Sequence, residues 1–393
     1  MAESSSAQDR IDTRESEADL AAARGDVTTA RRLLEEVSAS APDRAEPWLK
    51  LAAMCRAERD LDGALAAVGG ALRVDPLGFL PLLLKASLLD AAGRTGEAGE
   101  AFGHALAQRP VSIPAGLEAM VGVAERRDAE YKAALADRLV GAIAPLRARL
   151  APREARRLAR FRSNISRETR PFHSEPSHFH YPGLCEREFH DPEDFPWLAA
   201  LEGATADILA DLHRVMAAER AELVPYIQYP DDVPLRQWKT LNHSRDWTAI
   251  HLIRNGERVD ANARHCPATL ALLDRLDQPR VGARMPNAMF SMLAPGAHIP
   301  PHHGVANIRL VCHLGLIVPA GCWFRVGDER REWREGEAWV FDDTIEHEAA
   351  NPSESLRVIL IVDTWHPGLS SAERDAVRAT MEASGLGGEE EGL

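Results

Sequence analysis

Apolar and small residues recur with a helical period in the first third of the chain, and short apolar runs replace that pattern later. Pro42, Pro76 and Pro110 stand 34 residues apart, which is the period of tetratricopeptide helix pairs. The positions before each proline repeat in three sets, Ala30, Ala64 and Ala98, then Leu34, Val68 and Phe102, then Val37, Ala71 and Ala105. Small residues let paired helices approach closely, so the pattern predicts about three tetratricopeptide repeats over residues 11–112, after a disordered stretch at 1–10.

Residues 113–163 keep the helical pattern, with an apolar stripe at Leu139, Ile143 and Leu146. We expect these residues to form capping helices and a linker, because a terminal repeat needs a closing helix. The groove of such an array could bind a peptide or protein partner. A helical spacer or a dimerisation module is an equally good interpretation of the repeats alone.

Beyond residue 235 the chain changes to short apolar runs separated by Gly, Pro and Asp. The expected strands are DWTAIHLIR, NAMFSML, NIRLVCHLGLIV, CWFRVGD, EAWVFDD and LRVILIVDTW. Many short strands of this kind predict a double-sheet jelly roll. The predicted fold class is therefore α+β and multidomain, with a helical solenoid followed by a cupin-like double-stranded β-helix domain over residues 164–370.

The last segment, 371–393, reads as one helix with an acidic tip. Ser370 followed by Glu373 forms a capping box at the start of the helix. The final residues, GLGGEEEGL, have the composition of a disordered tail.

Composition and charge narrow the classes of partner. The formal net charge is −14, which argues against a nucleic-acid partner because phosphate binding needs a basic surface. The five cysteines, Cys55, Cys185, Cys266, Cys312 and Cys322, are scattered and lack a C-x-x-C pair, so neither a disulfide framework nor a zinc knuckle is expected. The polar N-terminus and the lack of a long apolar run predict a cytoplasmic protein with no membrane span.

Histidines near the predicted strands are the candidate metal ligands. His302 and His347 lie on either side of several apolar runs, and Arg357 follows ten residues after the second histidine. Two imidazoles with open coordination positions suit iron(II), but the usual H-x-D/E motif has Gly304 where its carboxylate should stand. His298 or His303 could instead supply a third ligand. A further set of histidines has irregular spacing and is a weak metal candidate: His173, His178, His180 and His190.

The stretch from Tyr181 to Pro367 resembles the aspartyl/asparaginyl β-hydroxylase family. The motifs that carry the resemblance are HYPGL at 180–184, DFPW at 194–197, H-x-G at 302–304, HLGLIVP at 313–319, FDDTIEHE at 341–348 and R-x-I-x-I-V-D-T-W-H-P at 357–367. The resemblance implies an oxygenase that uses iron(II), 2-oxoglutarate and O₂ on a double-stranded β-helix. It also implies that the glycine of H-x-G marks a ligand that is absent from the whole family.

Site roles follow from the same resemblance. It implies that His302 and His347 bind iron and that Arg357 pairs with the distal carboxylate of 2-oxoglutarate. Further residues match positions that contact the cosubstrate, Ser291, His313 and Trp247, or the substrate, Arg309. Asp342 and Asp343 could orient a ligand or could be ordinary turn residues.

One departure concerns the substrate. Val311 stands where the mammalian enzymes carry a second substrate arginine, which puts a disulfide-bonded, EGF-like aspartyl substrate in doubt. The β-carbon of Asp or Asn in a peptide is the expected target, and a free amino acid, a small metabolite or a lipid acyl chain are alternatives. Two other classes remain open: a tetratricopeptide scaffold with a silent barrel, and a cupin-like dioxygenase without a cosubstrate.

Overall fold

The protein forms two compact units, one that ends at Thr169 and one that begins at Arg170. The structure is a computed structural model that describes residues 2–218, 223–230, 232, 235–282 and 284–384. The observed division lies six residues after the expected boundary at 163/164. The predicted acidic tip, 385–393, lies outside the described residues.

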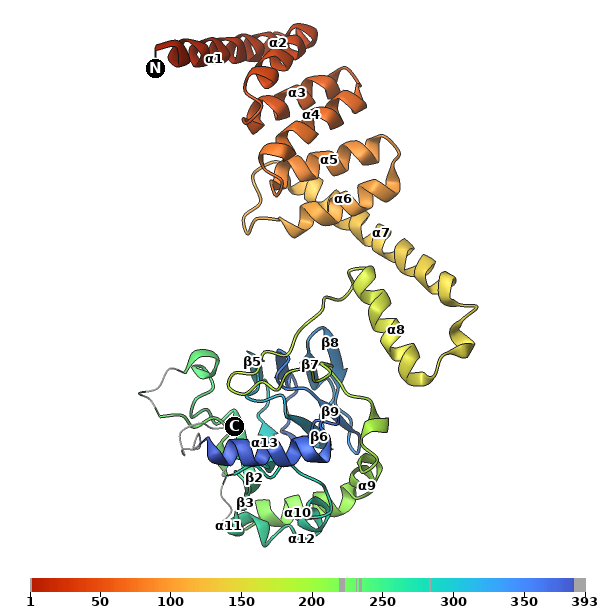
Figure 1. The fold of residues 1–393 in the computed structure, drawn as a ribbon, viewed down its shortest axis with the longest axis vertical. Coiled ribbons are helices and arrows are strands. Elements are labelled where there is room, and N and C mark those ends of the chain that lie inside the picture. The colour runs from red at the N-terminus through yellow and green to blue at the C-terminus, as the bar shows by residue number, and fades with distance from the viewer. Residues whose placement is uncertain (1, 219–222, 231, 233–234, 283, 385–393) are drawn as a thin grey trace. The chain divides into compact units, whose positions relative to one another are not determined.

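The N-terminal unit is built from antiparallel helix pairs that repeat along the chain (Figure 1). Second helices of successive pairs begin at Val27, Leu61 and Thr95, which reproduces the 34-residue period. The helices are α1 (Ala2–Ala23), α2 (Val27–Ser40), α3 (Ala45–Ala57), α4 (Leu61–Val74), α5 (Phe79–Ala91), α6 (Thr95–Ala107), α7 (Glu118–Ile143), the 3-10 helix η1 (Arg147–Arg149) and α8 (Pro152–Ile165). The expected disordered stretch at 1–10 is wrong, because α1 begins at Ala2 and continues through it.

Small residues determine how closely these helices pack. Ala30, Ala64 and Ala98 are buried at the helix contacts, as the repeat pattern predicts. A Cβ atom added at Gly70 would lie only 2.3 Å from the ring of Trp48, so the pair α3/α4 requires glycine there. The long helix α7 adds Val121 and Ala124 to the core of the last pair and closes the array.

The C-terminal unit contains two antiparallel sheets. In the larger sheet the order is β1-β2-β4-β11-β6-β9, with β3 paired to β2, and in the smaller sheet it is β5-β10-β7-β8. The strands are β1 (Val224–Pro225), β2 (Trp247–Arg254), β3 (Glu257–Arg258), β4 (Ala288–Leu293), β5 (His298–His302), β6 (Arg309–Ile317), β7 (Trp323–Val326), β8 (Glu329–Glu332), β9 (Ala338–Phe341), β10 (His347–Ala350) and β11 (Arg357–Trp365). The six predicted strands are present as β2, β4, β6, β7, β9 and β11, and the two sheets form an open double layer rather than a closed barrel.

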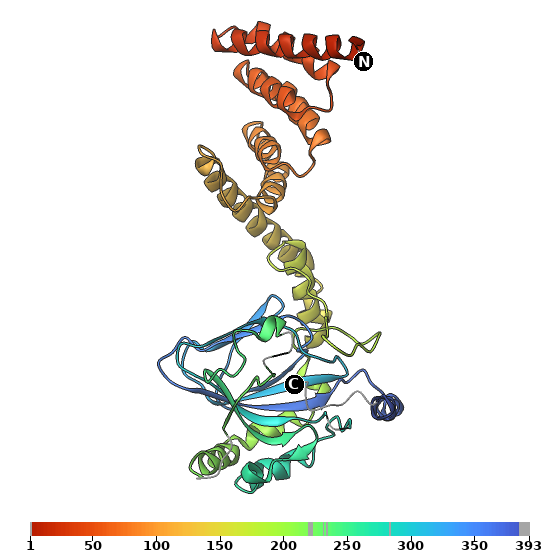
Figure 2. The ribbon, with the colours of Figure 1, turned by 90° about the vertical axis from the view of Figure 1, so that its left-hand side faces the viewer.

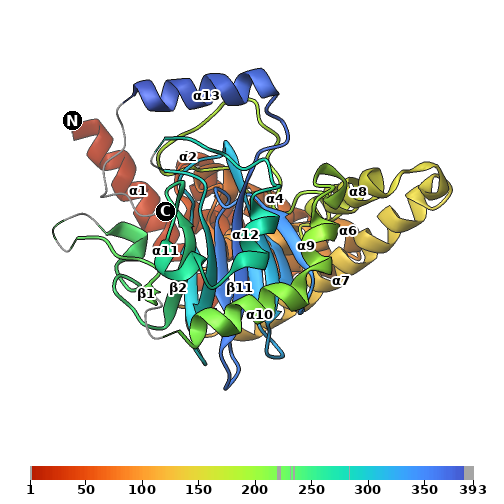
Figure 3. The same ribbon diagram turned by 90° about the horizontal axis from the view of Figure 1, so that it is seen from below.

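Residues of the larger sheet alternate between two apolar layers because side chains of a strand point to opposite faces in turn. On β11, Val358, Leu360 and Val362 face short helices, whereas Ile359 and Ile361 face the smaller sheet. The covering helices are visible in front of the sheet in Figure 3, and the two sheets are seen as layers in Figure 2. The covering helices are α9 (Leu198–Gly203), α10 (Thr205–Met216), α11 (Asp260–Ala263) and α12 (Pro267–Leu273). Two short 3-10 helices complete the unit, η2 (Pro192–Asp194) and η3 (Arg236–Trp238).

The C-terminal helix α13 (Ser371–Ala383) belongs to the second unit. Its capping box is confirmed, since the Ser370 hydroxyl accepts from the backbone N–H of Glu373 and the Glu373 carboxylate accepts from Ser370. Val377 packs with Trp365 and Leu369 in a separate small core. Among the described residues, no helix is both long enough and apolar enough to cross a membrane.

Candidate active site

A cavity of about 690 Å³ opens in the layer between the two sheets of the C-terminal unit. Both sheets contribute to its wall, because the odd-numbered residues of β6 and β11 point inward by the alternation described above. The structure brings together in this wall all seven residues that the sequence predicts for the site: Trp247, Ser291, His302, Arg309, His313, His347 and Arg357.

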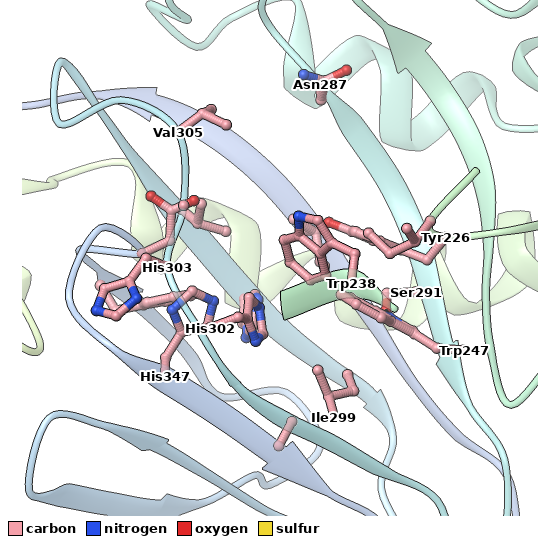
Figure 4. Close-up of a pocket in the computed structure, with 18 of the residues that line it drawn as sticks. Tyr226, Trp238, Trp247, Asn287, Ser291, Ile299, His302, His303, Val305 and His347 are labelled. Atoms are coloured by element: carbon pink, nitrogen blue, oxygen red, sulfur yellow. The ribbon is translucent and has the colours of Figure 1, made fainter. Parts of the chain in front are cut away.

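His302 and His347 form the centre of the cavity wall (Figure 4). They lie directly opposite each other on the paired strands β5 and β10, and their ring centroids are 4.0 Å apart. His302 Nδ1 lies 2.8 Å from the carbonyl of Pro300, and His347 Nδ1 lies 3.0 Å from the carbonyl of Ile345. A carbonyl only accepts, so each Nδ1 is the donor and each Nε2 carries a free lone pair.

Burial keeps both imidazoles neutral. It lowers the pKa of His347 to about 4, and it lowers the pKa of His302 with a further contribution from His347. Neutral imidazoles of fixed tautomer, each held by a backbone carbonyl, have the form of metal-binding histidines. The pair can therefore hold a divalent metal through two Nε2 atoms.

Among the residues that the structure describes, no third protein ligand accompanies this pair. Within the described ranges, no group of three or more His, Cys, Asp or Glu side chains is placed to hold one metal ion. A Cβ atom added at Gly304 would lie 2.2 Å from Asp343 Oδ2, so the Asp343 carboxylate fills the space that a side chain at 304 would enter. Glycine at this position is a steric requirement of the neighbouring carboxylate. The second aspartate, Asp342, accepts from the backbone N–H and the hydroxyl of Thr344, which is a turn role.

The other candidate histidines have different surroundings, and two of them, His178 and His303, line the same cavity as the pair. His298 is exposed and pairs with Glu348 at 3.0 Å, and His303 lines the cavity with its ring 3.9 Å from Glu175. His173 pairs with the Glu186 carboxylate at 3.0 Å. His178 lies in the cavity wall, and the His190 ring packs against His366 with ring centroids 5.2 Å apart.

Arg357 is a buried cation that forms no ion pair with any of the described residues. Only 1% of its surface is exposed, its Nε lacks a hydrogen-bond partner, and its Nη1 reaches the Ser291 carbonyl at 3.4 Å. Its guanidinium lies 4.6 Å from the centroid of the Trp333 ring. Burial lowers its pKa to about 10. A buried, unpaired guanidinium in a cavity wall is suited to binding a carboxylate through two parallel hydrogen bonds.

Polar and aromatic groups surround that guanidinium. The Trp247 indole N–H donates to the Ser291 hydroxyl at 3.0 Å, which leaves the hydroxyl proton available to a ligand. His313 lies on β6, the strand next to β11. Burial lowers the pKa of His313 well below its usual value, and the positive charge of Arg357 lowers it further. Its buried Nδ1 has no hydrogen-bond partner in the part of the chain that the structure describes. This end of the cavity can therefore bind a small anion and shield it from water.

The opposite end of the cavity contains Arg309 between two carboxylates. Its Nη2 lies 2.9 Å from Asp343, and its Nη1 lies 3.5 Å from Asp363. Sequence reasoning did not single out Asp363 or the aromatic residues Tyr226 and Trp238, which also line the cavity. Asp363 stands two residues after Ile361 on the inward face of β11, so strand alternation was the signal that could have found it.

Comparison with known proteins adds a family to this geometry. The aspartyl/asparaginyl beta-hydroxylase family matches residues 206–367. The chain is 31% identical over 204 residues to the mouse aspartyl/asparaginyl beta-hydroxylase, an alignment that covers 51% of this chain and 27% of the relative. It is 34% identical over 202 residues to the ornithine lipid ester-linked acyl 2-hydroxylase of Rhizobium tropici, covering 51% of this chain and 68% of the relative.

The human aspartate beta-hydroxylase domain-containing protein 2 is also similar, at 40% identity over 137 residues that make up 34% of this chain and 37% of the relative. The chain thus spans about a quarter of the length of the mouse enzyme and a larger part of the bacterial one.

Proposed function

The chain belongs to the aspartyl/asparaginyl beta-hydroxylase family, and we propose that its C-terminal unit is an iron(II)- and 2-oxoglutarate-dependent dioxygenase. One observation carries the proposal above the others. Two neutral imidazoles with free Nε2 atoms line the same cavity as a buried arginine that has no ion pair with any described residue. The two imidazoles suit iron(II), and the arginine suits a dicarboxylate cosubstrate.

His302 and His347 would hold the iron, and Arg357 would hold the distal carboxylate of 2-oxoglutarate. When bound, iron and 2-oxoglutarate supply the activation of O₂, with oxidation of the cosubstrate to succinate and carbon dioxide. The carbonyls of Pro300 and Ile345 hold the Nδ1 side of each ring, so the two Nε2 atoms would be the ones that bind the metal.

Other residues of the cavity position the cosubstrate. The Ser291 hydroxyl, which accepts from Trp247, can donate to a carboxylate oxygen. Phe324 and Phe341 pack on His313 with ring centroids 5.0 and 4.7 Å away, and this apolar wall excludes water from the reacting atoms.

The target that we propose is the β-carbon of an Asp or Asn residue in a peptide or protein. The name of the family supports this class of substrate. The end of the cavity that contains Arg309, which we call the substrate end, has an aromatic lining that suits a side chain held beside His302 and His347. The bacterial relative favours a second candidate, an acyl chain of a lipid, because the chain covers 68% of that acyl 2-hydroxylase.

The N-terminal helix array has a proposed part in substrate choice. Stacked helix pairs of this kind present an extended surface on which peptides can bind, so we propose that the array binds the substrate protein or a partner protein. A scaffold with a silent catalytic unit would gain nothing from burying Arg357 without an anion, which disfavours that alternative. A cytoplasmic location remains a prediction from composition.

Turnover of the cosubstrate tests the proposal. Purified chain with iron(II), O₂ and ascorbate should convert 2-oxoglutarate to equal amounts of succinate and carbon dioxide, because ascorbate reduces the second oxygen atom to water when no substrate is present. His302→Ala should lower that rate on the order of 100-fold, because a single imidazole holds the metal weakly. Absence of 2-oxoglutarate binding and turnover in the parent chain, or equal rates in the variant, would overturn the proposal.

A further inference from the structure

Three charged side chains at the substrate end form a cluster of one arginine and two aspartates. Arg309 on β6, Asp343 after β9 and Asp363 on β11 line the cavity, and at most 7% of each is exposed. The guanidinium contacts both carboxylates, at 2.9 Å for Asp343 and 3.5 Å for Asp363. The second oxygen of Asp363 accepts from the backbone N–H of Asn287 at 2.7 Å.

The cluster has no spare positive charge for a substrate carboxylate. With both aspartates ionised it carries a surplus negative charge, and with one of them protonated it is neutral. Burial raises the pKa of each aspartate, and Arg309 counteracts that rise. Among the described side chains, Arg357 is the other arginine that lines the cavity, and it lies at the cosubstrate end beside Ser291. An incoming carboxylate would therefore meet like charge in a buried site, which is costly.

The same cluster has unused hydrogen-bonding groups of both kinds. Among the described residues, Asp343 Oδ1 is a buried acceptor and Arg309 Nε a buried donor, each without a hydrogen-bond partner, and Arg309 Nη1 has only the 3.5 Å ion pair with Asp363. Buried polar groups are normally hydrogen-bonded, so these atoms indicate a ligand with matching groups. The ligand must present an acceptor to Arg309 and an N–H donor to Asp343.

We propose that the substrate end of the cavity binds a carboxamide, and that the enzyme selects the side chain of asparagine over that of aspartate. The amide carbonyl accepts from Arg309, and the amide N–H donates to Asp343 Oδ1. A carboxylate of the same shape has acceptors only and cannot fill the second position. This inference rests on the proposed function, since it names the substrate of the same site.

Val311 is consistent with this selectivity. It lies on β6 two residues after Arg309, lines the cavity, and stands directly opposite Asp363 on β11. An arginine at this position would place a second guanidinium beside Asp363 and balance the two carboxylates. The short apolar side chain leaves the surplus negative charge in place.

Equilibrium binding of matched peptides tests the assignment. Three capped pentapeptides that differ only in a central Asn, Asp or Leu are titrated without O₂ into the full chain, with iron(II), in the presence and absence of 2-oxoglutarate. We expect the Asn peptide to bind about tenfold or more tightly than the Asp and Leu peptides, because each loses a buried hydrogen bond. Val311→Arg should bring the Asn and Asp affinities to within about twofold, since it supplies the missing positive charge. Val311→Met, of similar length but neutral, should keep the parent ratio.

Three results would overturn the assignment: equal or tighter binding of the Asp peptide by the parent chain, an unchanged ratio in Val311→Arg, or binding of 2-oxoglutarate without binding of any peptide. Failure of 2-oxoglutarate to bind would count against the proposed function instead. In that case the peptide ratio measured without 2-oxoglutarate still decides the charge assignment.

Discussion

Replacing Arg357 with methionine should raise the stability of the empty protein and abolish cosubstrate binding. Its guanidinium is buried without a carboxylate partner among the described residues, and burial lowers its pKa from its ordinary value to about 10. A shift of this size corresponds to about 3 kcal/mol of unfavourable free energy for the charged form. The contact with the Trp333 ring, 4.6 Å away, is worth about 1–2 kcal/mol and is lost in the variant.

The difference between these two effects predicts that Arg357→Met raises the free energy of unfolding by about 1–2 kcal/mol. Methionine fills a similar apolar volume, so no large cavity opposes the gain. The bidentate bond to 2-oxoglutarate disappears, which should weaken cosubstrate binding on the order of 100-fold. Arg357→Lys, which keeps the charge without the planar fork, should bind 2-oxoglutarate with intermediate affinity.

Denaturant unfolding of the full chain, followed by tryptophan fluorescence, measures the first effect, and calorimetric titration of 2-oxoglutarate without O₂ measures the second. The reasoning is refuted if Arg357→Met loses several kcal/mol of stability while still binding 2-oxoglutarate. That combination would mean that Arg357 stabilises the fold and does not bind the anionic cosubstrate.

Three further changes separate steric, proton-linked and domain-specific effects. Gly304→Ala should lower the free energy of unfolding by about 1–3 kcal/mol in denaturant titrations, because its Cβ would lie 2.2 Å from Asp343 Oδ2 and overpacking is costly. His347 should contribute about 3 kcal/mol to the fall in unfolding free energy as the pH drops from about 6.5 to 4. The reason is that burial lowers the pKa of His347 to about 4, so the unfolded state takes up the proton first. His347→Asn should remove this contribution and make the slope shallower, while the other buried histidines keep the rest of it, and an unchanged slope would contradict the cause. Gly70→Ala should lower the melting temperature of the helix array through its clash with Trp48 at 2.3 Å, with 2-oxoglutarate affinity equal to that of the parent.

Periodicity predicted the elements whose cores are regular. The 34-residue spacing located the helix pairs, and the apolar runs located the six strands with a strongly buried face. The missed strands include β5, with the sequence HIPPH, and β10, with the sequence HEAA. Two prolines and several polar residues remove the strand signal there, although these strands present the two metal-site histidines. The helix at the N-terminus was missed because residues 2–10 are polar and carry no apolar stripe.

The candidate site was predicted mainly from family resemblance, because spacing in sequence does not show which strands meet. Arg357 gives the clearest independent signal, since an arginine at the head of a buried strand needs an anion. The contact between Gly304 and Asp343 could not be predicted, since it joins a loop after β5 to a turn after β9. The same applies to the cluster in which Asp343 and Asp363 share Arg309.

Metal stoichiometry tests the central claim most directly. Equilibrium dialysis of the full chain against iron(II) without O₂ should give one iron per chain. His302→Ala and His347→Ala should each lose that iron, whereas the exposed His298→Ala should retain it as a matched control. Retention of the iron by His302→Ala or His347→Ala, or its loss in His298→Ala, would contradict a site built on this pair of imidazoles.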